Sequence, residues 1–114
     1  MNSSRKAAIQ AYKEQKPQRG IFAVRCQTTG SAWVDSAPDL RAAENRIWFL
    51  LQHGDHFMEK TILTEFAAHG RDAFTFEVLE KLDEDIAAMS VRDALRDRKN
   101  HWAEQLNARR LSPI

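Results

Sequence analysis

The sequence predicts a small α/β domain, in which a short antiparallel sheet of three strands is flanked by helices. Two patterns carry this prediction. Three short segments read as strands, one of them with alternating apolar and polar residues, and apolar residues recur every three or four positions in longer segments. The chain has 114 residues, the length of one domain. Short strands with helices between and around them are typical of an α/β architecture.

Three segments are predicted to form strands. Residues 21–26 and 31–35 form the first two, and the polar, glycine-containing turn between them predicts a hairpin. Residues 74–79 form the third strand, because apolar side chains there alternate with Thr75 and Glu77 as they do in a half-buried strand.

Four segments are predicted to be helical: residues 4–15, 38–53, 57–69 and 83–107. In the second helix, Leu40, Ala43, Ile47 and Leu50 recur at spacings that place them on one face. The second and third helices should each end at a glycine, the usual residue just beyond a helix C-terminus.

We expect two parts in the chain, an N-terminal helix and linker (residues 1–19) and the α/β domain (residues 20–110). No apolar run reaches the ~18 residues that a membrane-spanning helix requires. The N-terminus is polar and basic, unlike a secretory leader. The single cysteine, Cys26, cannot form an internal disulfide. A cytoplasmic location without membrane association is therefore expected.

The net charge is only +1, but the cations are unevenly spread. Residues 1–54 carry 8 Lys and Arg against 4 Asp and Glu. The excess gathers near the N-terminus, in Arg5, Lys6, Lys13, Lys16 and Arg19. This pattern predicts at most weak, salt-dependent nucleic-acid binding. The alternative is that these cations form only a solvated helix face.

Several short motifs follow one another along the chain. Residues 20–22 read GIF and residues 33–35 read WVD, with Trp33 eleven positions after Phe22. Residues 66–80 contain FAAHG and FTFEVLE, and residues 101–107 begin with His-Trp and end with Leu-Asn. In order and spacing these motifs resemble the GIY-YIG endonucleases, including their phage and intron-homing members. The resemblance spans about residues 20–107 and implies a GIY-YIG-like fold.

The family resemblance also implies a chemistry, which is metal-assisted phosphodiester hydrolysis. Family members use two tyrosines, an arginine and a metal-binding glutamate, and these positions correspond here to Phe22, Trp33, Ala43 and Lys99. Phe22 lacks the hydroxyl, and the indole of Trp33 can donate a hydrogen bond but cannot act as a base. The ammonium of Lys99 would repel a metal ion. We therefore expect no catalytic residues, no metal and no cofactor.

The sequence thus favours a non-catalytic, binding or regulatory protein that uses the former active-site cleft. Its expected binding residues are Phe22, Trp33, Asp35, Arg41, Arg46, Trp48 and Lys99. The occupant is left open as a small ligand, a protein or nucleic acid, and an oligomer is also compatible with the sequence. Lys99 falls within an apolar helical stripe. Its ammonium either reaches out to solvent past a packed stem or sits in the cleft beside Asp35.

Two other functions are compatible with the sequence. The first is a divalent-metal-dependent DNA endonuclease with a rearranged site, in which Arg46 would replace the missing arginine. Asp97 and Glu104 lie near Lys99 in sequence, although Asp97 is about 200° around the helix from it. The second is a structural role in an oligomer or in a bacterial or phage-like assembly.

Overall fold

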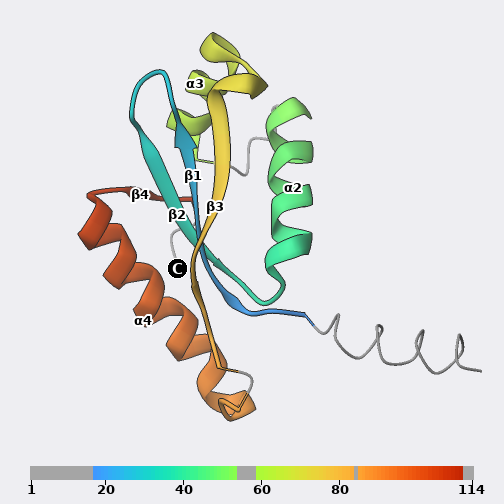
Figure 1. Ribbon diagram of the computed structural model, residues 1–114, viewed down its shortest axis with the longest axis vertical. Coiled ribbons are helices and arrows are strands. Elements are labelled where there is room, and N and C mark those ends of the chain that lie inside the picture. Colours follow the sequence, from blue (N-terminus) through green and yellow to red (C-terminus); the bar gives the residue numbers. More distant parts are fainter. Residues whose placement is uncertain (1–16, 54–58, 84, 112–114) are drawn as a thin grey trace, which may run out of the picture.

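In a computed structural model, the chain forms a four-stranded sheet with helices packed against both of its faces (Figure 1). The structure describes residues 17–53, 59–83 and 85–111, so the helix expected at residues 4–15 lies outside the described residues. The strands are β1 (Gly20–Cys26), β2 (Ala32–Ala37), β3 (Phe74–Lys81) and β4 (Arg109–Arg110). The helices are α2 (Leu40–His53), α3 (Lys60–His69), the short 3-10 helix η1 (Arg71–Ala73) and α4 (Ala88–Leu106).

The sheet has the strand order β3-β1-β2-β4. β1 is central and pairs antiparallel with both β2 and β3, as the sequence predicts. The expectation of three strands is wrong, because β4 adds a fourth, which runs parallel to β2 beside Trp33 and Val34. A two-residue strand is too short to produce a periodic pattern, so the sequence could not reveal it.

The end of α4 explains how β4 reaches the sheet. Asn107 adopts a left-handed conformation (φ 50°), and the N–H of Ala108 donates to the carbonyl of Ala103, which reverses the chain. Past β4, the N–H of Leu111 donates to the carbonyl of Val34 at 3.0 Å. Leu111 is consequently buried against the sheet.

The described α-helices follow the predicted order, but each begins later than the sequence suggests, α3 at Lys60 rather than at residue 57. The side chain of Asp39 accepts from the N–H groups of Arg41 and Ala42, so α2 starts at Leu40. α4 begins at Ala88 rather than at residue 83, because the carboxylate of Asp83 closes a turn with the N–H of Asp85. None of the described helices is long and apolar enough to cross a membrane.

The core has two parts, one on each face of the sheet. α2 and α3 cover the first, in which Phe22, Val24 and Trp33 are buried. α4 covers the second, where Leu95, Trp102 and Leu106 pack over the β1 and β2 residues Ile21, Ala23 and Val34. Because β1 is buried on both faces, its residues are apolar at successive positions rather than alternating.

Gly20 lies where other parts of the chain approach the backbone of β1 closely. A Cβ atom at this position would lie 2.2 Å from the carbonyl oxygen of Glu80 and 2.9 Å from a methyl group of Leu40. The residues before it also belong to the packed unit, because the carbonyl of Gln18 accepts from the N–H of Leu40 and that of Arg19 from the N–H of Leu82. β1, β3 and the start of α2 therefore converge on a residue without a side chain.

Candidate binding groove

A groove with a volume of about 730 Å³ lies between α2 and α4, over one end of β2. β4 pairs only with Trp33 and Val34, so the rest of β2 has no described strand on that side. The apolar lining comes from the sheet, both helices and the C-terminal segment: Phe22, Ala37, Pro38, Ala42, Ala43, Ile47, Leu50, Val91, Leu95 and Leu111. The charged lining residues are Asp35, Asp39, Arg46, Arg92, Arg96 and Lys99.

Lys99 and Asp35 form an ion pair in this groove. The Nζ atom of Lys99 lies 3.6 Å from Oδ1 of Asp35, and their side chains are 2% and 18% exposed. The same carboxylate oxygen accepts from the N–H of Ser36 at 2.8 Å. Of the two positions considered for the ammonium, the one beside Asp35 is confirmed, and the one in open solvent is wrong. Burial of a charge is costly without such a partner.

Phe22 and Ala43 lie in the groove, on β1 and α2 respectively. The ring of Phe22 is 2% exposed and stacks on that of Phe76, with centroids 4.8 Å apart. Arg46, one turn beyond Ala43 on α2, lines the same groove. The structure therefore brings together Phe22, Asp35, Arg46 and Lys99 from the expected set.

Trp33 does not line the groove, although it lies on the same face of β2 as Asp35. Its fully buried indole Nε1 donates to the carboxylate of Glu59 (3.1 Å) and the hydroxyl of Thr61 (2.9 Å). These two residues are at the start of α3, which covers this part of the strand. Trp33 therefore anchors α3 to the sheet, and its expected place in the cleft is wrong.

Arg41 and Trp48 are also outside the groove lining. They lie about 200° and 140° around α2 from Ala43, so they face away from α4. The guanidinium of Arg71 lies over the ring of Trp48 at 3.6 Å, and Arg41 is exposed. Proximity in sequence to the motif residues placed them in the expected set, but the helix directs them elsewhere.

Arg92, Arg96 and Leu111 are among the lining residues that the expected binding set left out. Arg92 and Arg96 precede Lys99 by seven and three positions, a spacing that marks one helix face and could have revealed them. Nothing in the local sequence points to Leu111, because its place depends on the return of the chain beside β2.

The two carboxylates named for the endonuclease alternative lie elsewhere on α4. Asp97 is exposed and its carboxylate lies 3.6 Å from Nε of Arg96, while Glu104 is exposed near the end of the helix. Neither lines the groove. Among the described residues, no group of three His, Cys, Asp or Glu side chains is arranged to hold a metal ion.

A second polar cluster holds α4 to β3. The indole Nε1 of Trp102 and the Nε of Arg98 each donate to Oε1 of Glu80 at 2.8 Å. Burial acts to raise the pKa of Glu80, but these hydrogen bonds and the charges of Arg98 and His101 outweigh it, so the pKa lies below its usual value. This cluster fixes the helix that carries Lys99.

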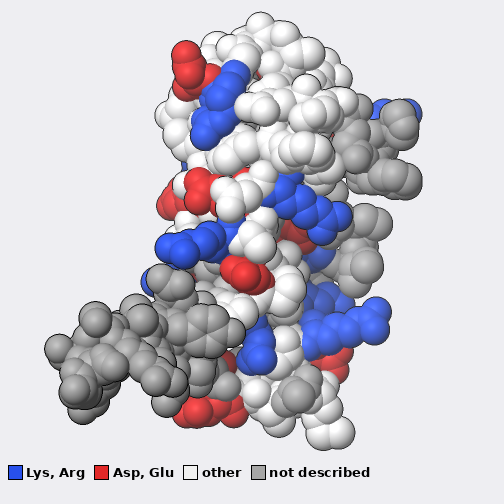
Figure 2. All heavy atoms as spheres, turned by 90° about the vertical axis from the view of Figure 1, so that its right-hand side faces the viewer, with Lys and Arg blue, Asp and Glu red and all other residues white. Residues whose placement is uncertain are grey.

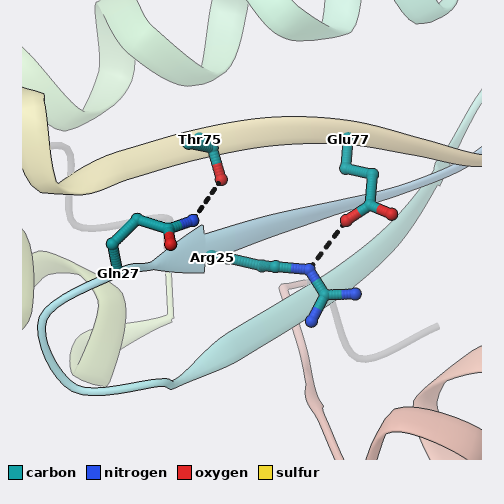
Figure 3. A network of polar contacts seen from close by, with 4 residues as sticks. All are labelled: Arg25, Gln27, Thr75 and Glu77. Atoms are coloured by element: carbon teal, nitrogen blue, oxygen red, sulfur yellow. Dashed lines mark hydrogen bonds and ion pairs between the residues drawn. The ribbon is translucent and has the colours of Figure 1, made fainter.

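Cross-strand polar pairs fix the register of β1 and β3 (Figure 3). Nε of Arg25 lies 2.8 Å from the carboxylate of Glu77, and the amide of Gln27 donates to the hydroxyl of Thr75. Both pairs are solvent-exposed. They stabilise the sheet that carries Phe22.

Comparisons with known proteins identify the fold. No protein-family model and no curated protein matches the sequence. The catalytic domain of the homing endonuclease I-TevI is similar in structure, with a TM-score of 0.68 and 23% identity over 82% of this chain and 98% of that one. A mutant of the catalytic domain of intron endonuclease I-TevI gives a TM-score of 0.65 and 26% identity over 79% and 84%. Together with the motif order along β1 and β2, this likeness shows that the chain has the fold of the GIY-YIG superfamily.

Proposed function

We propose that this chain is a non-catalytic GIY-YIG-fold domain that binds a ligand or partner in the groove between α2 and α4. The observation that carries the proposal is the buried pair of Lys99 and Asp35. Lys99 stands where the family resemblance places a metal-binding glutamate. Its ammonium already compensates the neighbouring carboxylate, so a divalent cation there would meet a positive charge rather than a ligand.

The other positions implied by the resemblance support the same conclusion. Phe22 has no hydroxyl and packs its ring on Phe76. The indole of Trp33 is committed to Glu59 and Thr61, and Ala43 has no group to neutralise charge on a phosphate. The proton-transferring, charge-stabilising and metal-binding roles therefore have no candidates at these positions.

The groove itself remains open for binding. Its volume of about 730 Å³ lies within the range of roughly 300–1,000 Å³ typical of small-molecule sites. Its lining combines an apolar surface with a few charged groups, which is the usual composition of such sites. A binding function needs this cavity but none of the lost catalytic groups.

The test is incubation with supercoiled plasmid and branched DNA in the presence of Mg²⁺ or Mn²⁺, with an active GIY-YIG endonuclease domain as positive control. We expect no cleavage by the full chain. Metal-dependent cleavage that disappears in Arg46→Ala would overturn the proposal and support the alternative, an endonuclease with a rearranged site. The Arg41→Ala variant, changed on the same helix outside the groove, is the matched control.

Nucleic acid is a second candidate partner, since both similar structures are catalytic domains of endonucleases. Figure 2 looks at the side of the molecule that lies at the right in Figure 1. It shows Lys and Arg side chains interspersed with Asp and Glu rather than gathered into one block. Strong sequence-independent binding to nucleic acid depends on clustered cations. This distribution favours a smaller ligand over a long stretch of phosphate backbone.

A further inference from the structure

We infer that the groove accommodates a small amphipathic anion, with an apolar body and one carboxylate or sulfonate group. This inference rests on the proposed binding function and specifies the class of ligand. Most of the lining is apolar: Phe22 and Ala37 come from the sheet, Ala43, Ile47 and Leu50 from α2, and Leu95 from α4. Such a surface is favourable for a hydrocarbon chain or an aromatic ring, because binding removes both surfaces from water.

Both carboxylates that line the groove have partners within the protein. Asp35 pairs with Lys99 and also accepts from the N–H of Ser36. Asp39 accepts from two N–H groups in the first turn of α2. Neither carboxylate is therefore positioned to select a cationic ligand.

The arginines of the groove differ in whether a carboxylate of the protein compensates their charge. The guanidinium of Arg96 lies 3.3 Å from the carboxylate of Asp93 and 3.6 Å from that of Asp97. Across residues 17–53, 59–83 and 85–111, Arg46 and Arg92 form no ion pair. They stand on the two helices that wall the groove, Arg46 on α2 and Arg92 on α4, and both are exposed.

This charge balance determines which end of the ligand lies where. Lys99 is compensated by Asp35 inside the groove, whereas Arg46 and Arg92 bring uncompensated positive charge to its walls. An anionic head group would therefore bind to these two guanidinium groups, which match the geometry of a carboxylate or sulfonate. The apolar body would extend over Phe22 and Ala43. The size of the groove suits a molecule of this kind.

The inference can be tested by isothermal titration calorimetry of the full chain with three probes that each contain a ten-carbon chain. Each probe is kept below its critical micelle concentration. The probes are decanoate, decyltrimethylammonium and the neutral decyl maltoside. We expect decanoate to bind at least tenfold more tightly than the other two. Equal affinities for all three probes, or no binding of decanoate, would overturn the inference.

Matched variants locate the site. Arg46→Gln and Arg92→Gln should each weaken decanoate binding about tenfold, while Arg41→Gln, on the outer side of α2, should leave it unchanged. An equal loss in Arg41→Gln would show a non-specific charge effect and contradict the inference.

Displacement of decanoate by a short DNA duplex at a lower concentration would assign the groove to nucleic acid instead. Failure of decanoate binding without DNA cleavage would refute this inference alone, whereas metal-dependent cleavage would refute the proposed function.

Discussion

Lys99 is a charged residue in the buried lining of the groove. Its side chain is 2% exposed and lies on a helix face whose other members, Leu95 and Trp102, pack against the sheet or line the groove. The ammonium is tolerated there because Asp35, itself 18% exposed, lies 3.6 Å away. Such a pair stabilises little compared with an apolar pair of the same size, but loss of one partner is costly.

The first prediction concerns this ion pair. Lys99→Met should lower the free energy of unfolding by about 2 kcal/mol, because Asp35 loses its cation, and partial exposure of Asp35 keeps the loss below that of a fully buried pair. The double variant Lys99→Met with Asp35→Asn should regain most of this loss. Urea denaturation of the two single variants and the double variant measures the coupling. Strict additivity of the single effects would show that the two groups do not interact.

The second prediction uses the same position to introduce an acid. Lys99→Glu should place two carboxylates side by side, so the melting temperature should fall markedly. Added Mg²⁺ should restore part of this loss, because a divalent cation compensates both charges. Thermal unfolding with Mg²⁺ and with EDTA is the measurement, and the unsubstituted chain is the control. A melting temperature that does not respond to Mg²⁺ would show that the oxygens cannot converge on a cation.

The third prediction concerns Gly20. Gly20→Ala should destabilise the domain by roughly 3 kcal/mol or more, because the new Cβ would lie 2.2 Å from the carbonyl oxygen of Glu80. Gly30→Ala is the informative comparison, since Gly30 has a φ of 78° but a Cβ added there would meet nothing within 4 Å. That variant should lose only about 1 kcal/mol, the cost of a left-handed conformation. Chemical denaturation measures the free energy of unfolding of both variants. Equal losses in the two would mean that a shift of β3 relieves the steric clash at Gly20.

At the scale of residues, the motif order located the groove but not its full lining. Phe22, Asp35, Arg46 and Lys99 could be placed because strand alternation and helix spacing fix their directions. The same rules exclude Arg41 and Trp48 once the groove-facing side of α2 is known. The position of Trp33 depends on α3 covering that part of β2, a tertiary arrangement that no local pattern contains.

Among the elements, α3 depends most clearly on a single side chain. The carboxylate of Glu59 accepts from the N–H and the hydroxyl of Thr61 and from the indole of Trp33, so it caps the helix and joins it to β2. Burial acts to raise the pKa of Glu59, but these hydrogen bonds prevail and place the pKa below its usual value of 4.5.

The fourth prediction follows from this lowered pKa. The stabilisation from Glu59 is fully present above the unfolded pKa of 4.5 and is lost as the pH falls through the lower folded value. Glu59→Gln should cost about 1 kcal/mol at neutral pH and should make stability fall less steeply below pH 4.5. Urea denaturation across pH 3–7 tests this, with Glu104→Gln on the exposed side of α4 as control. If the stability of Glu59→Gln fell as steeply below pH 4.5 as that of the unsubstituted chain, the lowered pKa of Glu59 would be contradicted.

The elements themselves were predictable to different degrees. β3 and α2 have clear periodic patterns and β1 is a continuous apolar run, and these elements and β2 appear close to their expected bounds. The start of α4 was placed too early because Asp83 and Asp85 look like the first turn of a helix but form a separate turn. β4 has two residues, and only its pairing with β2 makes it a strand.

At the scale of the whole molecule, the groove exists because elements from opposite ends of the described chain meet. The sheet contributes Phe22 and Asp35, whereas α4 and the segment after β4 contribute Lys99 and Leu111. Sequence patterns could predict the sheet and the helices as separate elements. They could not predict this cavity, since its shape depends on how α2 and α4 are placed across the end of β2.

The fifth prediction concerns DNA binding by the whole chain. Any such binding should be weak and should fall steeply with salt, because the basic excess lies mainly before Gly20 in sequence. Deletion of residues 1–16 should abolish it and keep the fold, since Gln18 and Arg19 make hydrogen bonds to α2 and Leu82 and must stay. Fluorescence anisotropy with a labelled duplex at 50 and 200 mM salt measures this. Submicromolar binding that persists at 200 mM salt in the deletion variant would contradict the prediction.

The contribution of Leu111 to the groove has a consequence for synthesis on the ribosome. A chain emerges from its N-terminus, so β1, β2 and α2 are available to fold before α4 and the segment after β4 exist. During that interval Phe22 lacks one wall of its cavity, and Asp35 lacks the ammonium that compensates it. A nascent chain therefore exposes the apolar side of Phe22 and leaves the carboxylate of Asp35 without its cation. Only a chain extended beyond Leu111 therefore has the complete lining of the groove.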